Sequence, residues 1–180
     1  SVLALISIWF AQNMNINHNK RRELINCIRR LSYDIENTIE SSKLKAKEIA
    51  KYLVDKNSVF LLGKGACEYY AKEGSLKIKE IGYIHAEGYG SSALKHGPYS
   101  LIVSGTPVIL LIPNDIHFNK NLNITEEIVS RYGYVIGISD RELSNKFSQT
   151  ITISHNPYFV GLLSTIPLQL IAFELALAKG

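Results

Sequence analysis

Three ionisable side chains, Glu73, Lys77 and Glu80, are spaced so that they share one stripe of a helix. At 100° per residue they fall within about 60° of one another, which places an ammonium group between two carboxylates. The commoner explanation of such a stripe is a solvated helix face with ion pairs at i,i+3 and i,i+4. The chemical alternative is a general base that a neighbouring cation keeps ionised, in a site that moves a proton between carbon atoms.

A histidine downstream of this stripe is the best candidate for a second acid–base group. His96 stands before a Gly-Pro pair, in a stretch rich in glycine and serine that we expect to form an irregular loop over residues 87–98. Histidine titrates near neutral pH, so in a cleft it is an acid–base candidate, and a structural role is the alternative. Three further histidines lie in polar connections and are predicted to be surface residues: His18, His117 and His155.

A glycine turn ends the first short apolar run of the chain. Residues 59–62 read VFLL and are followed by Gly63, Lys64 and Gly65, which is typical of a buried parallel strand that turns sharply into a helix. Such a turn can present backbone N–H groups to an anion, but this one lacks the GxxxxGK[ST] spacing of a nucleotide-binding loop. Tight-turn geometry is therefore the more common explanation of these glycines.

Short apolar runs alternate with helical patterns, which predicts a parallel sheet. We therefore predict an α/β fold, a three-layer αβα sandwich with a mainly parallel sheet, preceded by helices. Ligands of such sheets bind beyond the carboxyl ends of the strands, where the glycine turn and the loop lie. Strands are expected at residues 59–62, 107–113, 134–139 and 151–154, and helices at residues 66–84, 123–132 and 161–179.

The first 57 residues are predicted to be largely helical. Residues 2–11 are apolar almost all round, as in a helix that packs on several sides, and residues 13–19 form a polar connection. A helical pattern then runs from residue 20 to residue 56, with a break and an N-cap expected at Ser41 and Ser42.

Composition excludes several classes of protein. The 180 residues are 46% hydrophobic and 20% charged, as in an ordinary globular domain rather than a disordered or fibrous chain. A net charge of +4, with no aromatic platform beside the basic residues, argues against nucleic-acid binding. Cys27 and Cys67 have no CxxC or histidine-rich context, which excludes a zinc site of the usual spacing and indicates a reducing compartment.

Two apolar segments, residues 2–11 and 159–178, have a composition that also occurs in membrane proteins. The second is long enough to span a bilayer, but it contains Pro167, Gln169 and Glu174 and has no flanking anchors. We expect both segments to be buried helices and the protein to be cytoplasmic, without a membrane partner.

The segment from Tyr69 to Ile102 resembles a known enzyme family. Its sequence, YYAKEGSLKIKEIGYIHAEGYGSSALKHGPYSLI, is similar to the isomerase half of glutamine:fructose-6-phosphate amidotransferases, which make glucosamine 6-phosphate and are also called glucosamine-6-phosphate synthases. The likeness extends through PVILLIP to the closing PLQLIAFELALAKG. Other sugar-isomerase (SIS) domain proteins share the EG-x-LK-x-KE helix and a histidine loop more loosely.

The resemblance implies a role for each candidate residue. In the family, the acid that matches Glu80 moves a proton between C1 and C2 of the sugar. The lysine that matches Lys77 steadies the developing oxyanion, and the acid that matches Glu73 lines the same pocket. The histidine that matches His96 assists ring opening and enters from the partner subunit of a dimer. No metal or organic cofactor is implied; the implied partners are a sugar phosphate (fructose 6-phosphate or glucosamine 6-phosphate) and a second copy of the chain.

Other parts of the family's site have no match in this sequence. The family's SxSGxT phosphate loop and its glutaminase domain do not occur, and its Schiff-base lysine lies in a tail after the last helix. The resemblance implies that residues 1–12 are the last helix of a preceding SIS subdomain, 13–57 a helical connector and 58–180 a second SIS subdomain, in a fragment that is inactive alone. The alternatives are another SIS enzyme, such as a fructosamine-6-phosphate deglycase or ketose–aldose isomerase, and a non-catalytic sensor of an amino-sugar phosphate.

Overall fold

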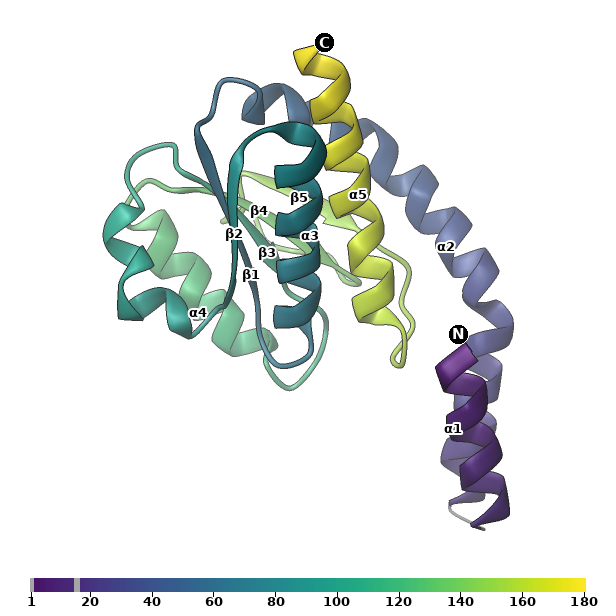
Figure 1. The fold of residues 1–180 in the computed structure, drawn as a ribbon. Coiled ribbons are helices and arrows are strands. Elements are labelled where there is room, and N and C mark those ends of the chain that lie inside the picture. Colours follow the sequence, from purple (N-terminus) through teal and green to yellow (C-terminus); the bar gives the residue numbers. More distant parts are fainter. Residues whose placement is uncertain (1, 15–16) are drawn as a thin grey trace.

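The computed structural model of the chain describes residues 2–14 and 17–180, and a five-stranded sheet forms its centre (Figure 1). All neighbouring strands run parallel, and their order across the sheet is β2-β1-β3-β4-β5. The all-parallel sheet confirms the predicted fold class. The strands are β1 (Ser58–Gly63), β2 (His85–Gly90), β3 (Pro107–Leu111), β4 (Tyr134–Ser139) and β5 (Gln149–Thr152).

Side chains of the central strands are buried on both faces of the sheet. In β1, Val59 and Leu61 belong to one hydrophobic core, whereas Phe60 and Leu62 belong to a second core on the opposite face. Successive side chains of a strand point to opposite faces. In a strand that is covered on both faces, apolar residues are therefore favoured at every position. This explains why the central strands read as continuous apolar runs.

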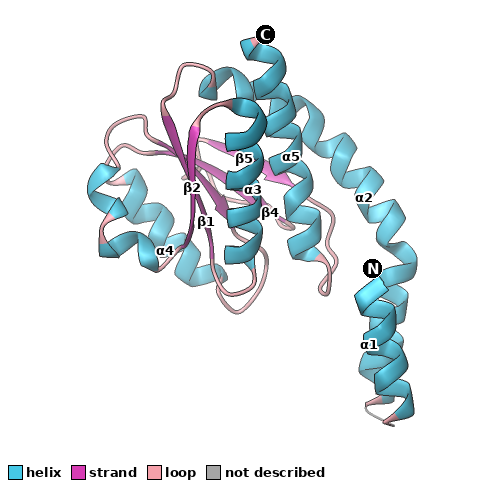
Figure 2. Ribbon diagram, in the orientation of Figure 1, coloured by secondary structure: helices cyan, strands magenta, loops and turns pink. Residues whose placement is uncertain are grey.

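Helices cover both faces of the sheet, as the three-layer prediction requires (Figure 2). One face carries α2 (His18–Leu53), α3 (Cys67–Gly82) and α5 (Val160–Lys179), and α5 contacts both of the other helices. The other face carries α4 (Phe118–Val129) and two short 3-10 segments, η1 (Ala93–His96) and η2 (Pro98–Leu101).

The edge strand β2 was not expected, because its sequence HAEGYG contains two glycines and falls partly in the predicted loop. The structure shows why glycine is needed at Gly88: a Cβ atom there would come within 2.5 Å of the Lys72 Cα atom of α3. The glycine therefore allows a strand and a helix to approach closely, and does not break the strand. The irregular loop begins only after Gly90.

Two helix predictions were also wrong in detail. α4 begins at Phe118, five residues before the expected start. No break interrupts α2, which continues through the two serines. Ser42 is buried, and the Ser41 hydroxyl donates hydrogen bonds to the carbonyl oxygens of Thr38 (3.2 Å) and Thr152 (2.9 Å), so it joins α2 to β5 instead of capping a new helix.

The first helix, α1 (Val2–Asn13), is not the buried helix that its composition predicted. None of its residues is buried, and Leu3, Trp9 and Phe10 are each more than half exposed. It lies alongside the first turns of α2, away from the sheet (Figure 1). The predicted connection over residues 13–19 is shorter than expected, since α2 starts at His18, and residues 15–16 of it lie outside the described residues.

The last helix, α5, has the length and hydropathy of a membrane span, yet half of its apolar window is buried inside the fold. Leu163, Leu168, Ile171 and Leu175 lie in the same core as the sheet residues of that face. The prediction of a buried helix is therefore confirmed for this segment.

Candidate active site

The predicted stripe lies on the exposed side of α3. The Lys77 ammonium nitrogen is 3.0 Å from Glu80 Oε2 and 3.5 Å from Glu73 Oε1, so one cation bridges two carboxylates. The opposite side of the helix, which includes Ala71 and Ile78, is buried in the core. The structure therefore brings all three residues together, and α3 is fixed in place by packing rather than by the stripe itself.

The electrostatics of the stripe keep its central cation charged. Hydrogen bonding and charge attraction from Glu80, with a smaller contribution from Glu73, raise the pKa of the Lys77 ammonium group above its ordinary value. The three side chains remain 33–48% exposed, so a ligand or another chain can reach them. Such an arrangement places two carboxylates beside one fixed positive charge.

His96 ends the 3-10 segment η1 and projects from the surface. Gly97, which follows, has φ 142°, a value that side chains rarely permit, and Pro98 then starts η2. The segment is tied to α4 on both sides of the histidine. Before it, Lys95 pairs with Glu127 at 2.7 Å; after it, the Tyr99 hydroxyl donates to the Glu127 carbonyl oxygen at 2.9 Å. The loop therefore presents His96 from a fixed backbone.

The sheet separates His96 from the stripe within one chain. Residues Ala71 and Ile78 place α3 on one face of the sheet, whereas Leu94 of η1 belongs to the core on the other face. In Figure 1, α3 and α4 accordingly lie on opposite sides of the strands. The sequence predicted both parts of an acid–base site, and a single chain does not bring them into one pocket.

The structure also pairs groups that the sequence did not connect. His155 was predicted to be a surface residue; it is exposed, but its Nδ1 lies 2.6 Å from Oδ2 of Asp140, whose side chain is almost fully buried. The same carboxylate accepts a hydrogen bond from the Asn114 backbone N–H at 2.7 Å. Asp140 directly follows β4. This position at the carboxyl end of a strand is the sequence feature that could have identified it as a candidate residue.

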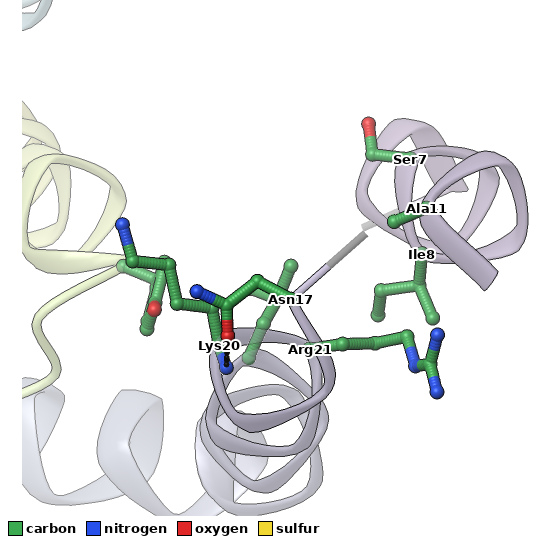
Figure 3. Close-up of a pocket in the computed structure, with 8 residues that line it drawn as sticks. Ser7, Ile8, Ala11, Asn17, Lys20 and Arg21 are labelled. Atoms are coloured by element: carbon green, nitrogen blue, oxygen red, sulfur yellow. Dashed lines mark hydrogen bonds between the residues drawn. The ribbon is translucent and has the colours of Figure 1, made fainter. Parts of the chain in front are cut away.

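A hollow of about 250 Å³ lies between α1, the start of α2 and Tyr158. Figure 3 shows Ile8 of α1 directed toward Arg21 of α2 across this hollow, with Ala11 beside it. None of the described residues that line it is a carboxylate, histidine or cysteine. It therefore contains none of the acid–base residues predicted from the sequence.

The residues described, 2–14 and 17–180, contain no group of three or more His, Cys, Asp or Glu side chains placed to hold a metal ion. Both cysteines are free and buried. Burial raises the pKa of the Cys67 thiol to about 12, with smaller contributions from the charges of Asp115 and Asp140, so this thiol stays protonated at neutral pH.

A known family model matches the part of the chain that contains these elements. The SIS domain model matches residues 52–179, from the end of α2 to the end of α5. The chain belongs to the SIS domain family. The match covers all five strands of the sheet, the α3 stripe and the His96 segment of this SIS domain.

Curated relatives of this SIS domain are named as isomerising glutamine–fructose-6-phosphate aminotransferases. A probable enzyme of this name from Acanthamoeba polyphaga mimivirus is 37% identical over 180 residues, which is 99% of this chain and 30% of the relative. The enzyme of Gluconobacter oxydans is 35% identical, over 100% of this chain and 30% of the relative. The chain thus spans about three-tenths of the length of these relatives.

Two solved structures share the fold of this chain. The C-terminal domain of glucosamine-fructose-6-phosphate aminotransferase from Francisella tularensis matches 99% of this chain with a TM-score of 0.84 and 30% identity, and the match covers 51% of that chain. A tagatose-6-phosphate ketose/aldose isomerase from Escherichia coli matches 82% of this chain and 43% of its own, with a TM-score of 0.66 and 19% identity. The second likeness concerns the fold alone.

Proposed function

We propose that this SIS domain supplies the proton-transfer residues for the isomerisation of fructose 6-phosphate during its amination to glucosamine 6-phosphate with glutamine-derived ammonia. The observation that carries the proposal is the position of Lys77 between Glu73 and Glu80 on an exposed face of α3. The names of the relatives, which are 35–37% identical to this chain over 99–100% of its length, support this substrate class.

Glu80 is the proposed base. Its carboxylate takes a proton from C1 of the open-chain sugar and returns it to C2, while the O1 hydroxyl proton passes to the heteroatom on C2, so that the carbonyl moves to C1 with no net change in protons on the enzyme. The intermediate carries negative charge on the sugar oxygen, and the Lys77 ammonium is the cation beside Glu80 that can stabilise it. Glu73 holds the lysine from the other side, and its proposed role is to line the sugar site.

His96 is proposed to assist ring opening in the site of a partner subunit. Support comes from its position: it is held on the opposite face of the sheet from the stripe, so a site that uses both residues needs two chains. A homodimer satisfies this requirement with two equivalent sites, each completed by the other chain. We infer the dimer from this separation together with the family resemblance.

The exposed apolar surface of α1 supports the view that this domain works as part of a larger assembly. Large apolar side chains in a helix without buried residues are normally covered by another surface. A further domain of the same enzyme, carrying the phosphate-binding loop, is the proposed cover. We place the enzyme in the cytoplasm, since free buried thiols suit a reducing compartment.

The experiment that tests this function is substitution of the base in the complete aminotransferase to which the proposal assigns this chain. Glu80→Gln should lower kcat by about 10²–10⁴-fold, because the amide cannot accept the proton, while KM for fructose 6-phosphate changes by no more than a few-fold. Glu48→Gln is the matched control, since Glu48 also pairs with a lysine three residues earlier, Lys45, at 2.6 Å on an exposed helix face. Unchanged turnover in Glu80→Gln would refute the assignment.

A further inference from the structure

A second hollow, separate from the α3 stripe, lies beyond the carboxyl ends of the strands. Its volume is about 390 Å³, within the range of small-molecule sites. Its walls come from the loop after β1, the η1 segment and α4. The lining side chains are mostly polar or charged: Lys64, Ser92, Lys95, His96, Lys120, Asn123, Ile124 and Glu127.

The hollow lies where the topology of the sheet predicts a ligand. The chain leaves β1 through α3 on one face toward β2, and leaves β3 through α4 on the other face toward β4. Neighbouring loops therefore diverge between β1 and β3, which opens a crevice at this point of a parallel sheet. Lys64 directly follows β1, and Lys120 lies in the first turn of α4, so one cation comes from each side of the crevice.

The charges of the hollow favour an anion. Three lysines face one carboxylate, Glu127, which is already paired with Lys95 at 2.7 Å. Within residues 2–14 and 17–180, no carboxylate forms an ion pair with Lys64 or Lys120. The Lys64 ammonium instead donates to the Ser92 hydroxyl, which holds it at the rim. Two cations without counter-charges thus remain beside neutral hydrogen-bond donors.

The wall behind these cations is built into the fold. Ser91, the neighbour of Ser92, is buried, and its hydroxyl donates to the side-chain oxygen of Asn121 in α4 at 2.9 Å. Leu94 and Ile124 are buried in the core beneath the hollow. The backbone that carries the polar groups is therefore fixed, so little ordering is required when a ligand binds.

We propose that this hollow is a second binding site, for a phosphate monoester, formed by Lys64 and Lys120 with Ser92 and Asn123 as hydrogen-bond donors. A phosphate group carries up to two negative charges and several acceptor oxygens, which match two ammonium groups and two neutral donors. The remaining volume accommodates the small organic group of the ester. The site is distinct from the α3 stripe, because it lies on the opposite face of the sheet from Glu80 and uses none of the stripe residues; it shares one lining residue, His96, with the proposed function.

The test is an NMR titration of the chain with glycerol 3-phosphate, with glycerol as the uncharged comparison. The expected result is saturable binding of the phosphate ester alone, with amide shifts gathered at residues 63–65, 92–97 and 119–124. The double variant Lys64→Ala/Lys120→Ala should bind at least about tenfold more weakly. A matched variant, Lys43→Ala/Lys45→Ala, removes two exposed lysines from α2 and should change the affinity by less than about twofold.

Three results would overturn the proposal: no saturable binding by the wild-type chain, shifts centred elsewhere, or equal weakening in the two lysine variants. If the double variant fails to fold, the location of the shifts in the wild-type chain decides. Glu80→Gln separates the two proposals. It should leave glycerol 3-phosphate binding unchanged, whereas it lowers turnover by about 10²–10⁴-fold if the proposed function is correct.

Discussion

Glu80 and His96 lie on opposite faces of the same sheet, the first on the exposed side of α3 and the second at the end of η1. Each is held by rigid surroundings: α3 packs against the sheet and α5, and η1 is tied to α4 through Lys95 and Glu127. Movement within one chain would have to disrupt a core to bring the two side chains together. The proposed acid–base chemistry therefore requires residues from two chains.

Substitution of the central cation distinguishes a catalytic stripe from a solvated helix face. In the complete enzyme, Lys77→Met should lower kcat by about 100-fold, because a charge beside the developing oxyanion is lost. KM and the denaturation midpoint should change little, since the lysine is partly exposed and its ion pairs lie at the surface. Lys45→Met, which breaks a comparable exposed pair with Glu48, is the control. If the stripe were only a solvated face, both variants would retain full turnover.

Gly88 is expected to be required for the contact between β2 and α3. In Gly88→Ala the new methyl group would meet the backbone of Lys72, and the strand and helix would have to separate. Overpacking of this kind costs about 1–3 kcal/mol of unfolding free energy. Urea denaturation measures the effect, with Thr152→Ala on an exposed position of β5 as the control, expected within about 0.5 kcal/mol of wild type. Equal stability of the two variants would contradict the close approach.

The buried Cys67 thiol should make stability depend on pH in the alkaline range. Its pKa is about 12 in the folded chain against the ordinary value of 9.0, so the folded state binds the proton more tightly. This contribution is fully present below pH 9 and is lost as pH rises from 9 toward 12. Between pH 8 and pH 10, Cys67→Ala should therefore lose about 1 kcal/mol less unfolding free energy than wild type. The same pH dependence in both proteins would contradict a buried, protonated thiol.

The sequence predicted elements and contacts best where a single physical requirement, such as burial on both faces or helical spacing, determined the residue types. Central strands such as residues 59–62 are buried on both faces, so their apolar runs predicted them directly. The α3 stripe followed from helical spacing alone. β2 was missed because its glycines serve a packing contact with α3, and the pattern of the strand itself does not show that contact. For the same reason the pattern at Ser41 and Ser42 suggested a break: the hydroxyl of Ser41 bonds to β5, more than a hundred residues away.

The candidate site was predicted in its residues but not in its arrangement. Spacing and family resemblance selected Glu73, Lys77, Glu80 and His96, and the structure confirms the contacts of the first three. The distribution of these residues over two faces depends on which side of the sheet each connection crosses, and local sequence does not contain that information. The hollow between Lys64 and Lys120 is likewise formed by residues that are 56 positions apart.

The division of the site between two chains is tested most directly by mixing two defective forms of the complete enzyme. Glu80→Gln and His96→Ala are each expected to have low turnover as homodimers. A mixed dimer contains one site with both intact residues, since the Glu80 of one chain meets the His96 of the other. Random mixing should restore about a quarter of wild-type activity. Activity that stays at the average of the two homodimers would show that His96 does not act on the partner's site, and would contradict the account.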